Sequence, residues 1–144
     1  MRLYTIGFTK TTAENFFDRL KEAEVKKVLD IRLHNNSQLA GFAKKEDLAF
    51  FLKQIVPCDY EHRLDLAPTE KILKKYRGQN GSWNTYAKNF LKLIRDREIE
   101  KIFKKRQLEH SCLLCSEDKP HFCHRKLVAE YLHEKWGGIE LVHL

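Results

Sequence analysis

Short apolar runs alternate along the chain with longer segments in which apolar residues recur every three or four positions. The short runs predict strands at residues 2–7, 26–33, 58–66, 111–117 and 139–144. The longer segments predict helices that each bury one face. These helices are expected to begin near Thr11, Leu48, Thr69, Trp83 and Cys123.

Local signals support several of the expected helix boundaries. Thr11 and Glu14 have the spacing of a capping box, so the first helix should begin at Thr11. Pro57 closes the second helix, and the Gly137-Gly138 pair ends the last one.

The alternation of strands with helices predicts β-α-β crossovers. We therefore expect one α/β domain over residues 1–144, with a mostly parallel sheet of about five strands and helices on both faces. This is the layering of Rossmann-like folds. Neither an internal repeat nor a low-complexity segment interrupts the order.

The net charge of +7 favours anionic partners, either a small anionic molecule or a nucleic acid. The basic residues occur in small groups that mostly alternate with carboxylates, as on ordinary solvated helix faces. If the partner were a nucleic acid, exposed aromatic rings would be expected to stack on its bases. The candidates for stacking are Tyr76, Trp83 and Tyr86.

The apolar runs are too short to cross a bilayer, and the first residues lead into a strand rather than a signal-peptide core. We expect a cytoplasmic protein without a membrane partner, and the oligomeric state stays open. A chain with this much apolar material does not need disulfides, so its four cysteines are expected to be reduced. They are Cys58, Cys112, Cys115 and Cys123.

Ligands of open parallel sheets bind at the carboxyl ends of the strands, where this chain places a Cys123-His124-Arg125 sequence at a helix start. A helix N-terminus and a neighbouring cation lower the pKa of a thiol, so Cys123 is the best candidate nucleophile. Glu117 and His124 are candidates for proton transfer. The alternative is that Cys123 and His124 are packing residues.

Further candidates follow the strand ends. Arg32 could hold a phosphate or carboxylate through two hydrogen bonds, or could instead form a buried ion pair with Asp30. The expected ligand-binding residues are Arg32, Asn35, Ser37, Cys115 and Arg125.

The Cys112 to Cys115 spacing resembles a zinc or redox motif, but a strand would direct the two sulfurs to opposite faces. We expect Cys112 to be buried and no metal to be bound, with a site formed by Cys115, His121, Cys123 and His124 as the alternative. A phosphate-binding P-loop and a dinucleotide fingerprint are both missing, so no cofactor is expected. The two-residue step from Cys123 to Arg125 also argues against a tyrosine-phosphatase loop.

With these residues identified, the chain resembles the domain of unknown function 488 family over nearly its whole length. The resemblance implies an α/β fold with a pocket lined by these motifs and does not supply a reaction. In the loop after Asp30-Ile31-Arg32, where members often carry a proline, this chain has His34-Asn35-Asn36. The matching stretches are Tyr4 to Gly7, Leu29 to Arg32, Ser37 to Phe42, Leu113 to Glu117 and Cys123 to Arg125.

Three classes of function remain open at this point. The first is an enzyme or ligand-binding domain that acts on a nucleotide or a nucleic-acid phosphate. The second is a nucleic-acid-binding accessory protein without catalysis, and the third is a thiol redox or metal-binding module.

Overall fold

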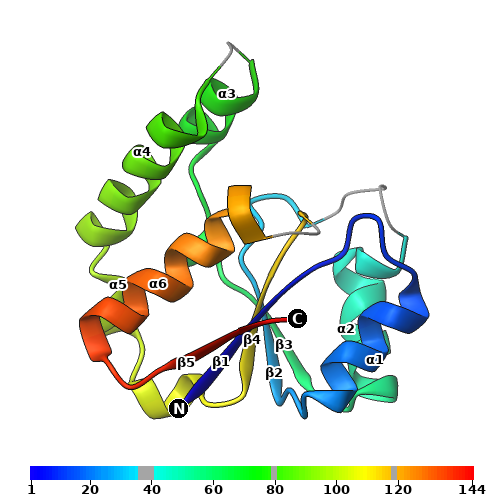
Figure 1. Ribbon diagram of the computed structural model, residues 1–144. Helices are drawn as coiled ribbons and strands as arrows, with labels where there is room; N and C mark the ends of the chain where they lie inside the picture. The colour runs from blue at the N-terminus through cyan, green and yellow to red at the C-terminus, as the bar shows by residue number, and fades with distance from the viewer. Residues whose placement is uncertain (36–40, 79–80, 118–119) are drawn as a thin grey trace.

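A computed structural model describes residues 1–35, 41–78, 81–117 and 120–144 of the chain. Its centre is a five-stranded sheet in the order β3-β2-β4-β1-β5, in which every recorded strand pair is parallel (Figure 1). This confirms the predicted α/β class. The strands are β1 (Arg2–Gly7), β2 (Lys27–Asp30), β3 (Asp59–His62), β4 (Ser111–Cys115) and β5 (Glu140–His143).

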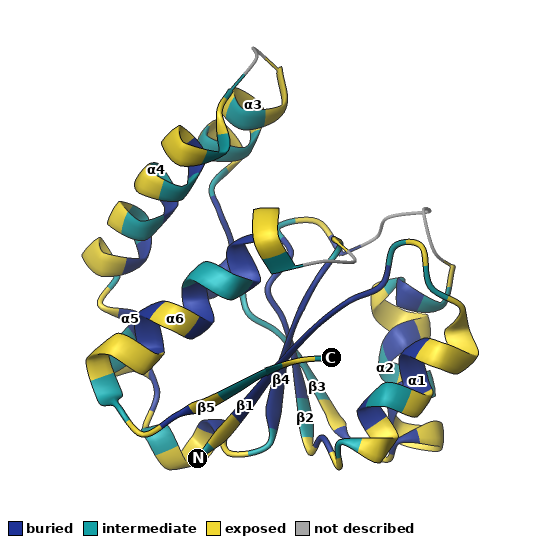
Figure 2. Cartoon of the chain, viewed as in Figure 1, coloured by how far each residue is buried: buried dark blue, intermediate teal, exposed yellow. Residues whose placement is uncertain are grey.

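Helices cover both faces of the sheet, and each face has its own hydrophobic core (Figures 1 and 2). The core beneath α1 and α2 takes Cys112 and Leu114 from β4, whereas the core beneath α4 and α6 takes Leu113. This alternation follows from the pleat of a strand that is buried on both sides. The helices are α1 (Ala13–Glu22), α2 (Lys45–Ile55), α3 (Glu70–Gly78), α4 (Trp83–Asp96), α5 (Ile99–Ile102) and α6 (His124–Trp136).

The helices α3 and α4 pack against each other and extend beyond the carboxyl edge of the sheet (Figure 1). Tyr76, Trp83 and Tyr86 form an aromatic cluster between them, with ring centroids 4.7–6.0 Å apart. Arg97, which follows α4, donates hydrogen bonds to the carbonyls of Asp65 and Ala67 at 2.8 and 2.7 Å. The hydrogen bonds of Arg97 attach the end of α4 to the segment that follows β3.

Some element boundaries differ from the sequence prediction. The N-cap of α1 is Thr12, whose hydroxyl accepts a hydrogen bond from the Asn15 amide, so the capping box predicted at Thr11 is wrong. The third strand ends at His62 because Leu64–Leu66 turns into a short 3-10 helix (η2). Thr69 caps α3 as its position predicted, since its hydroxyl accepts from the Ile72 amide.

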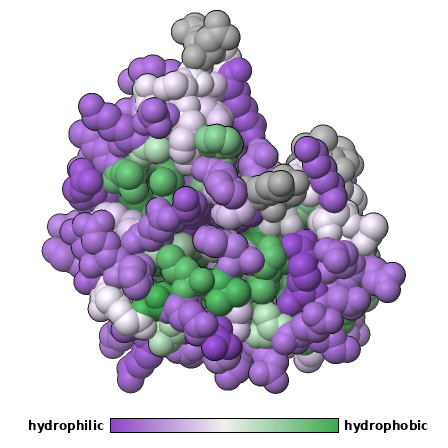
Figure 3. All heavy atoms as spheres, in the orientation of Figure 1, coloured by the Kyte–Doolittle hydropathy of each residue, from purple (hydrophilic) through white to green (hydrophobic). Residues whose placement is uncertain are grey.

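None of the helices in the described ranges is both long and apolar enough to span a membrane. The face drawn in Figure 3 is mostly hydrophilic, with hydrophobic residues gathered around its middle where β5 crosses the molecule. Leu141 and Val142 of β5 are only partly buried and pack against the two cores.

The central position of β4 gives a first prediction. Leu113→Ala should lower the free energy of unfolding by about 2–5 kcal/mol, because it opens a cavity in a fully buried strand. Leu64→Ala is the matched control, since Leu64 is 53% exposed and its truncation should cost less than about 0.5 kcal/mol. Urea denaturation of both variants measures the difference, and equal losses would contradict this account of the core.

Candidate functional site

A cavity of about 240 Å³ lies at the carboxyl edge of the sheet. We call it the edge cavity. Its floor is formed by residues that follow β2 and β4 and by the start of α6, and its wall by α3 and α4. The floor residues include Arg32, Cys115, Ser116, Glu117, Cys123 and His124, and the wall residues include Pro68, Leu73, Tyr76, Arg77 and Tyr86.

The sulfurs of Cys115 and Cys123 lie at bonding distance and form a disulfide. The two residues are 5% and 2% exposed, at the end of β4 and the N-cap of α6. The expectation of reduced thiols is therefore wrong for this pair, because the chain reversal after β4 returns Cys123 to the strand end. Cys58 and Cys112 are free and buried, as predicted for Cys112.

The imidazole of His124 faces both sulfurs. Its Nε2 lies 2.6 Å from the Ile31 carbonyl, which can only accept, so Nε2 carries the proton. The unprotonated Nδ1 then lies 3.7 Å from Cys115 Sγ and 4.0 Å from Cys123 Sγ. Burial lowers the pKa of His124 to about 4, so the ring is neutral at physiological pH.

Arg32 is 3% exposed and forms a buried ion pair with Asp30, with hydrogen bonds of 2.8 and 2.7 Å to the two carboxylate oxygens. Its Nη1 is buried and has no hydrogen-bond partner among the described residues. Tyr60 donates to the same carboxylate at 2.6 Å, and Asn35 donates to the Tyr60 hydroxyl at 3.3 Å. The ion pair with Asp30 is thus confirmed, and Arg32 also lines the edge cavity.

Arg125 lies beside the loop that follows β4. The side chain is fully buried, and its Nη1 donates to the backbone carbonyl of Glu117. That carbonyl also lies against Gly7, at the position that a Cβ of residue 7 would occupy. Arg125 is not among the described residues that line the edge cavity. Its hydrogen bond to the Glu117 carbonyl instead holds the loop that follows β4.

Five of the eight predicted site residues line the edge cavity, and Asn35 and Arg125 are not among the described residues that line it. Arg32, Cys115, Glu117, Cys123 and His124 all line it, with the Glu117 side chain exposed. Asn35 is buried against Tyr60, and Ser37 lies outside the described residues.

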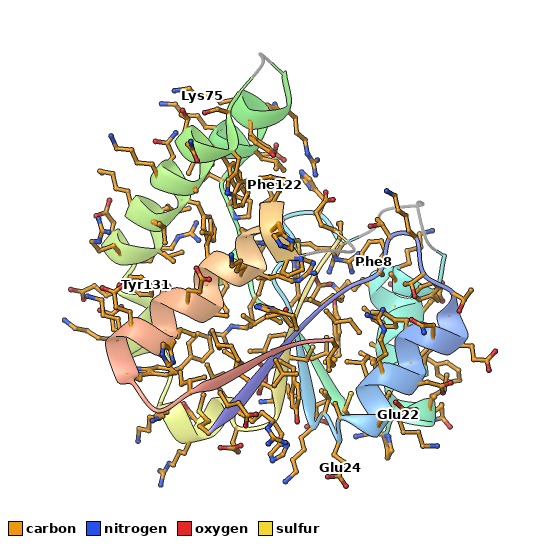
Figure 4. All side chains as sticks on the ribbon, in the orientation of Figure 1. Phe8, Glu22, Glu24, Lys75, Phe122 and Tyr131 are labelled. Atoms are coloured by element: carbon orange, nitrogen blue, oxygen red, sulfur yellow. A yellow bond between two sulfur atoms is a disulfide. The ribbon has the colours of Figure 1, made fainter. Side chains whose placement is uncertain are left out.

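The sequence patterns did not identify two of the residues that line the cavity. Arg77 and Phe122 line it, and Phe122 is 65% exposed between the start of α6 and the α3–α4 pair (Figure 4). The cluster of aromatic residues around Tyr76 was the available signal. The expectation that Tyr86 is exposed for stacking is wrong, since it is 5% exposed, and Tyr76 and Trp83 are half-buried.

Three buried groups could together hold a metal ion. Cys115 Sγ, Cys123 Sγ and one ring nitrogen of His124 lie within 4.8 Å of one another. His121, the fourth member of the alternative metal site, is exposed and lies outside this group.

Residues 12–132 match the model of a protein family described as domain of unknown function DUF488. The chain belongs to this family. Neither a curated protein nor a solved structure matches the chain. The DUF488 match contains every candidate site residue, whereas β1 and β5 lie outside it.

The contact between Gly7 and Glu117 gives a second prediction. Gly7→Ala should lower the free energy of unfolding by about 1–3 kcal/mol or more, because the new Cβ would overlap a backbone carbonyl. Gly41→Ala is the control, since no described atom lies within 4 Å of the added Cβ. Thermal unfolding of both variants is the measurement, and a Gly7→Ala protein as stable as the control would refute the close approach.

Proposed function

We propose that the edge cavity of this DUF488 protein binds a small anionic ligand, and that the reduced Cys115 and Cys123 pair reacts with it. Nucleotides and nucleic-acid phosphates are the first class to test. One observation carries the proposal: buried Arg32 and the cysteine pair line the same cavity.

The electrostatic surroundings of the cavity favour an anion. The N-terminus of α6 lies at the floor, and its first turn contains no acidic residue. Unpaired amides and the helix dipole attract negative charge at such a position. Arg32 adds a guanidinium with an unused donor, and Arg77 adds an exposed one from α3.

The wall of the cavity favours a ligand that also carries a flat ring. Tyr76 and Phe122 contribute aromatic surface to its lining. Aromatic side chains stack on nucleobases, whereas a bare phosphate would gain nothing from them. The volume of about 240 Å³ lies below the about 300–1,000 Å³ of typical ligand pockets, so a mononucleotide or a single terminal nucleotide fits best.

The reactive group would be the thiolate of Cys123 in the reduced protein. Its position at the N-cap of α6 stabilises a negative charge, and the neutral Nδ1 of His124 would accept a hydrogen bond from the thiol before its proton leaves. The Glu117 carboxylate, exposed at the rim, would exchange that proton with solvent. Arg125 would hold the Glu117 loop in place through its hydrogen bond to the carbonyl.

A thiol redox role is the second candidate, because the Cys115 and Cys123 sulfurs already lie at bonding distance. Oxidation of the two thiols would release two protons and pass two electrons to a disulfide substrate. A non-catalytic nucleic-acid-binding role rests on the net charge of +7 alone. It would be recognised by a steep loss of affinity with salt and by indifference to substitutions in the cavity.

The cysteine assignments predict an order of reactivity. In the reduced and metal-free protein, Cys123 should be alkylated by iodoacetamide before the other cysteines, and a nucleoside monophosphate should slow the reaction. Burial raises the pKa of Cys58 to about 12 and raises that of Cys112 as well, so both stay protonated and slow. Peptide mapping of the alkylated sites measures the order. If Cys123 reacts no faster than Cys58, it is not the nucleophile.

The cavity wall predicts the effect of a charge removal on binding. Arg77→Ala should weaken the binding of a nucleoside monophosphate about fivefold, which corresponds to about 1 kcal/mol for an exposed charge, without changing the binding of the nucleoside. Arg95→Ala removes the same charge from an exposed position on α4 outside the described cavity wall and should change neither affinity. Calorimetric titration separates the two variants. Equal effects would point to non-specific attraction by net charge.

A further inference from the structure

We propose that, in the reduced protein, Cys115, Cys123 and His124 bind a zinc ion whose fourth coordination position opens into the edge cavity. All three residues are buried, and their ligand atoms lie within 4.8 Å of one another. Two sulfurs and one imidazole nitrogen form a donor set that zinc prefers.

The orientation of His124 supports the assignment. Its Nε2 proton is donated to the Ile31 carbonyl, which directs the Nδ1 lone pair toward the two sulfurs. Within the described part of the chain, these two sulfurs are the partners of Nδ1. In the reduced protein a thiol could donate its proton to Nδ1, and a metal ion that displaces the thiol protons would take the same central position between the three ligand atoms. A backbone carbonyl on the other ring nitrogen is also the usual support of a ligating histidine.

The distances agree with tetrahedral coordination. Zinc–sulfur bonds of about 2.3 Å and a zinc–nitrogen bond of about 2.05 Å place sulfur and nitrogen about 3.6 Å apart. The observed separations of Nδ1 from the sulfurs are 3.7 and 4.0 Å. The two sulfurs would have to separate to about 3.8 Å. Their Cα atoms are 7.2 Å apart, more than the about 4.4–6.8 Å usual in disulfides, so the backbone has room for this change.

Binding would proceed only after the disulfide is reduced by two electrons from a thiol or phosphine. The ion would then form two bonds to sulfur and one to nitrogen and release the two thiol protons. Because all three ligands line the edge cavity, the remaining position faces the cavity and would hold water or a bound ligand. Three protein ligands with one open position are characteristic of reactive zinc sites rather than structural ones.

The test uses the full chain, reduced with a phosphine and freed of metal by a chelator. Titration with Co²⁺ as a spectroscopic probe should give tetrahedral visible bands and a thiolate charge-transfer band that saturate at one ion per chain. Zn²⁺ should abolish both bands. The same protein in its oxidised form should give neither, which tests the proposal without any substitution.

Variants identify the ligands. Cys115→Ser, Cys123→Ser and His124→Gln should each weaken metal binding by more than the about 10- to 100-fold typical of changes outside the ligand set. Cys58→Ala and Cys112→Ala should bind as the wild type does, since these free cysteines lie outside the group.

The outcomes separate this inference from the proposed function. A folded, reduced wild-type protein that gives no thiolate band, or a band lost equally in Cys112→Ala, overturns the zinc site. Zinc binding without any affinity for nucleotides supports the site and refutes the ligand class proposed above.

Discussion

The hydrogen bond from His124 to the Ile31 carbonyl determines the geometry of the whole candidate site. It is 2.6 Å long, fully buried, and joins residues separated by 93 positions in sequence. By fixing which nitrogen carries the proton, it makes the opposite nitrogen an acceptor that faces Cys115 and Cys123. It also anchors the first turn of α6 to the end of β2. The cavity floor therefore depends on one contact between the end of a strand and the start of a helix.

Two further buried charges belong to the same edge of the sheet, and each donates a hydrogen bond to a backbone carbonyl. Arg32 binds Asp30 and the Ala43 carbonyl, and Arg125 binds the Glu117 carbonyl. Burying a guanidinium is costly, so such groups persist where their hydrogen bonds fix a structure that function requires. Here both fix the loops that follow strands β2 and β4. The candidate chemistry thus lies at the ends of buried strands and at the start of α6, whereas Tyr76 and Tyr86 of the cavity wall come from the α3–α4 pair.

The sequence was sufficient to predict the fold class, the placement of Arg32, Cys115 and Cys123 at the carboxyl edge of the sheet, and the burial of Cys112, because hydrophobic periodicity and strand ends are local properties. It was insufficient for features that depend on distant neighbours. Thr11 and Thr12 have the same side chain, and only the phase of the helix selects Thr12 as the cap. The pairing of Cys115 with Cys123 depends on the path of the intervening loop. The Ile31 partner of His124 and the cavity wall from α3 have no local signature.

The strand order has a consequence for how the protein is made. β1 is the first strand of the chain, yet its neighbours in the sheet are β4 and β5, which contribute residues 111–115 and 140–143. During synthesis, residues 2–7 therefore wait without sheet partners until most of the sequence has left the ribosome. A strand whose residues 3–7 are all buried in the finished protein is then temporarily exposed to solvent and to other chains. For this topology the emerging polypeptide, rather than the folded domain, is the form most in need of a chaperone.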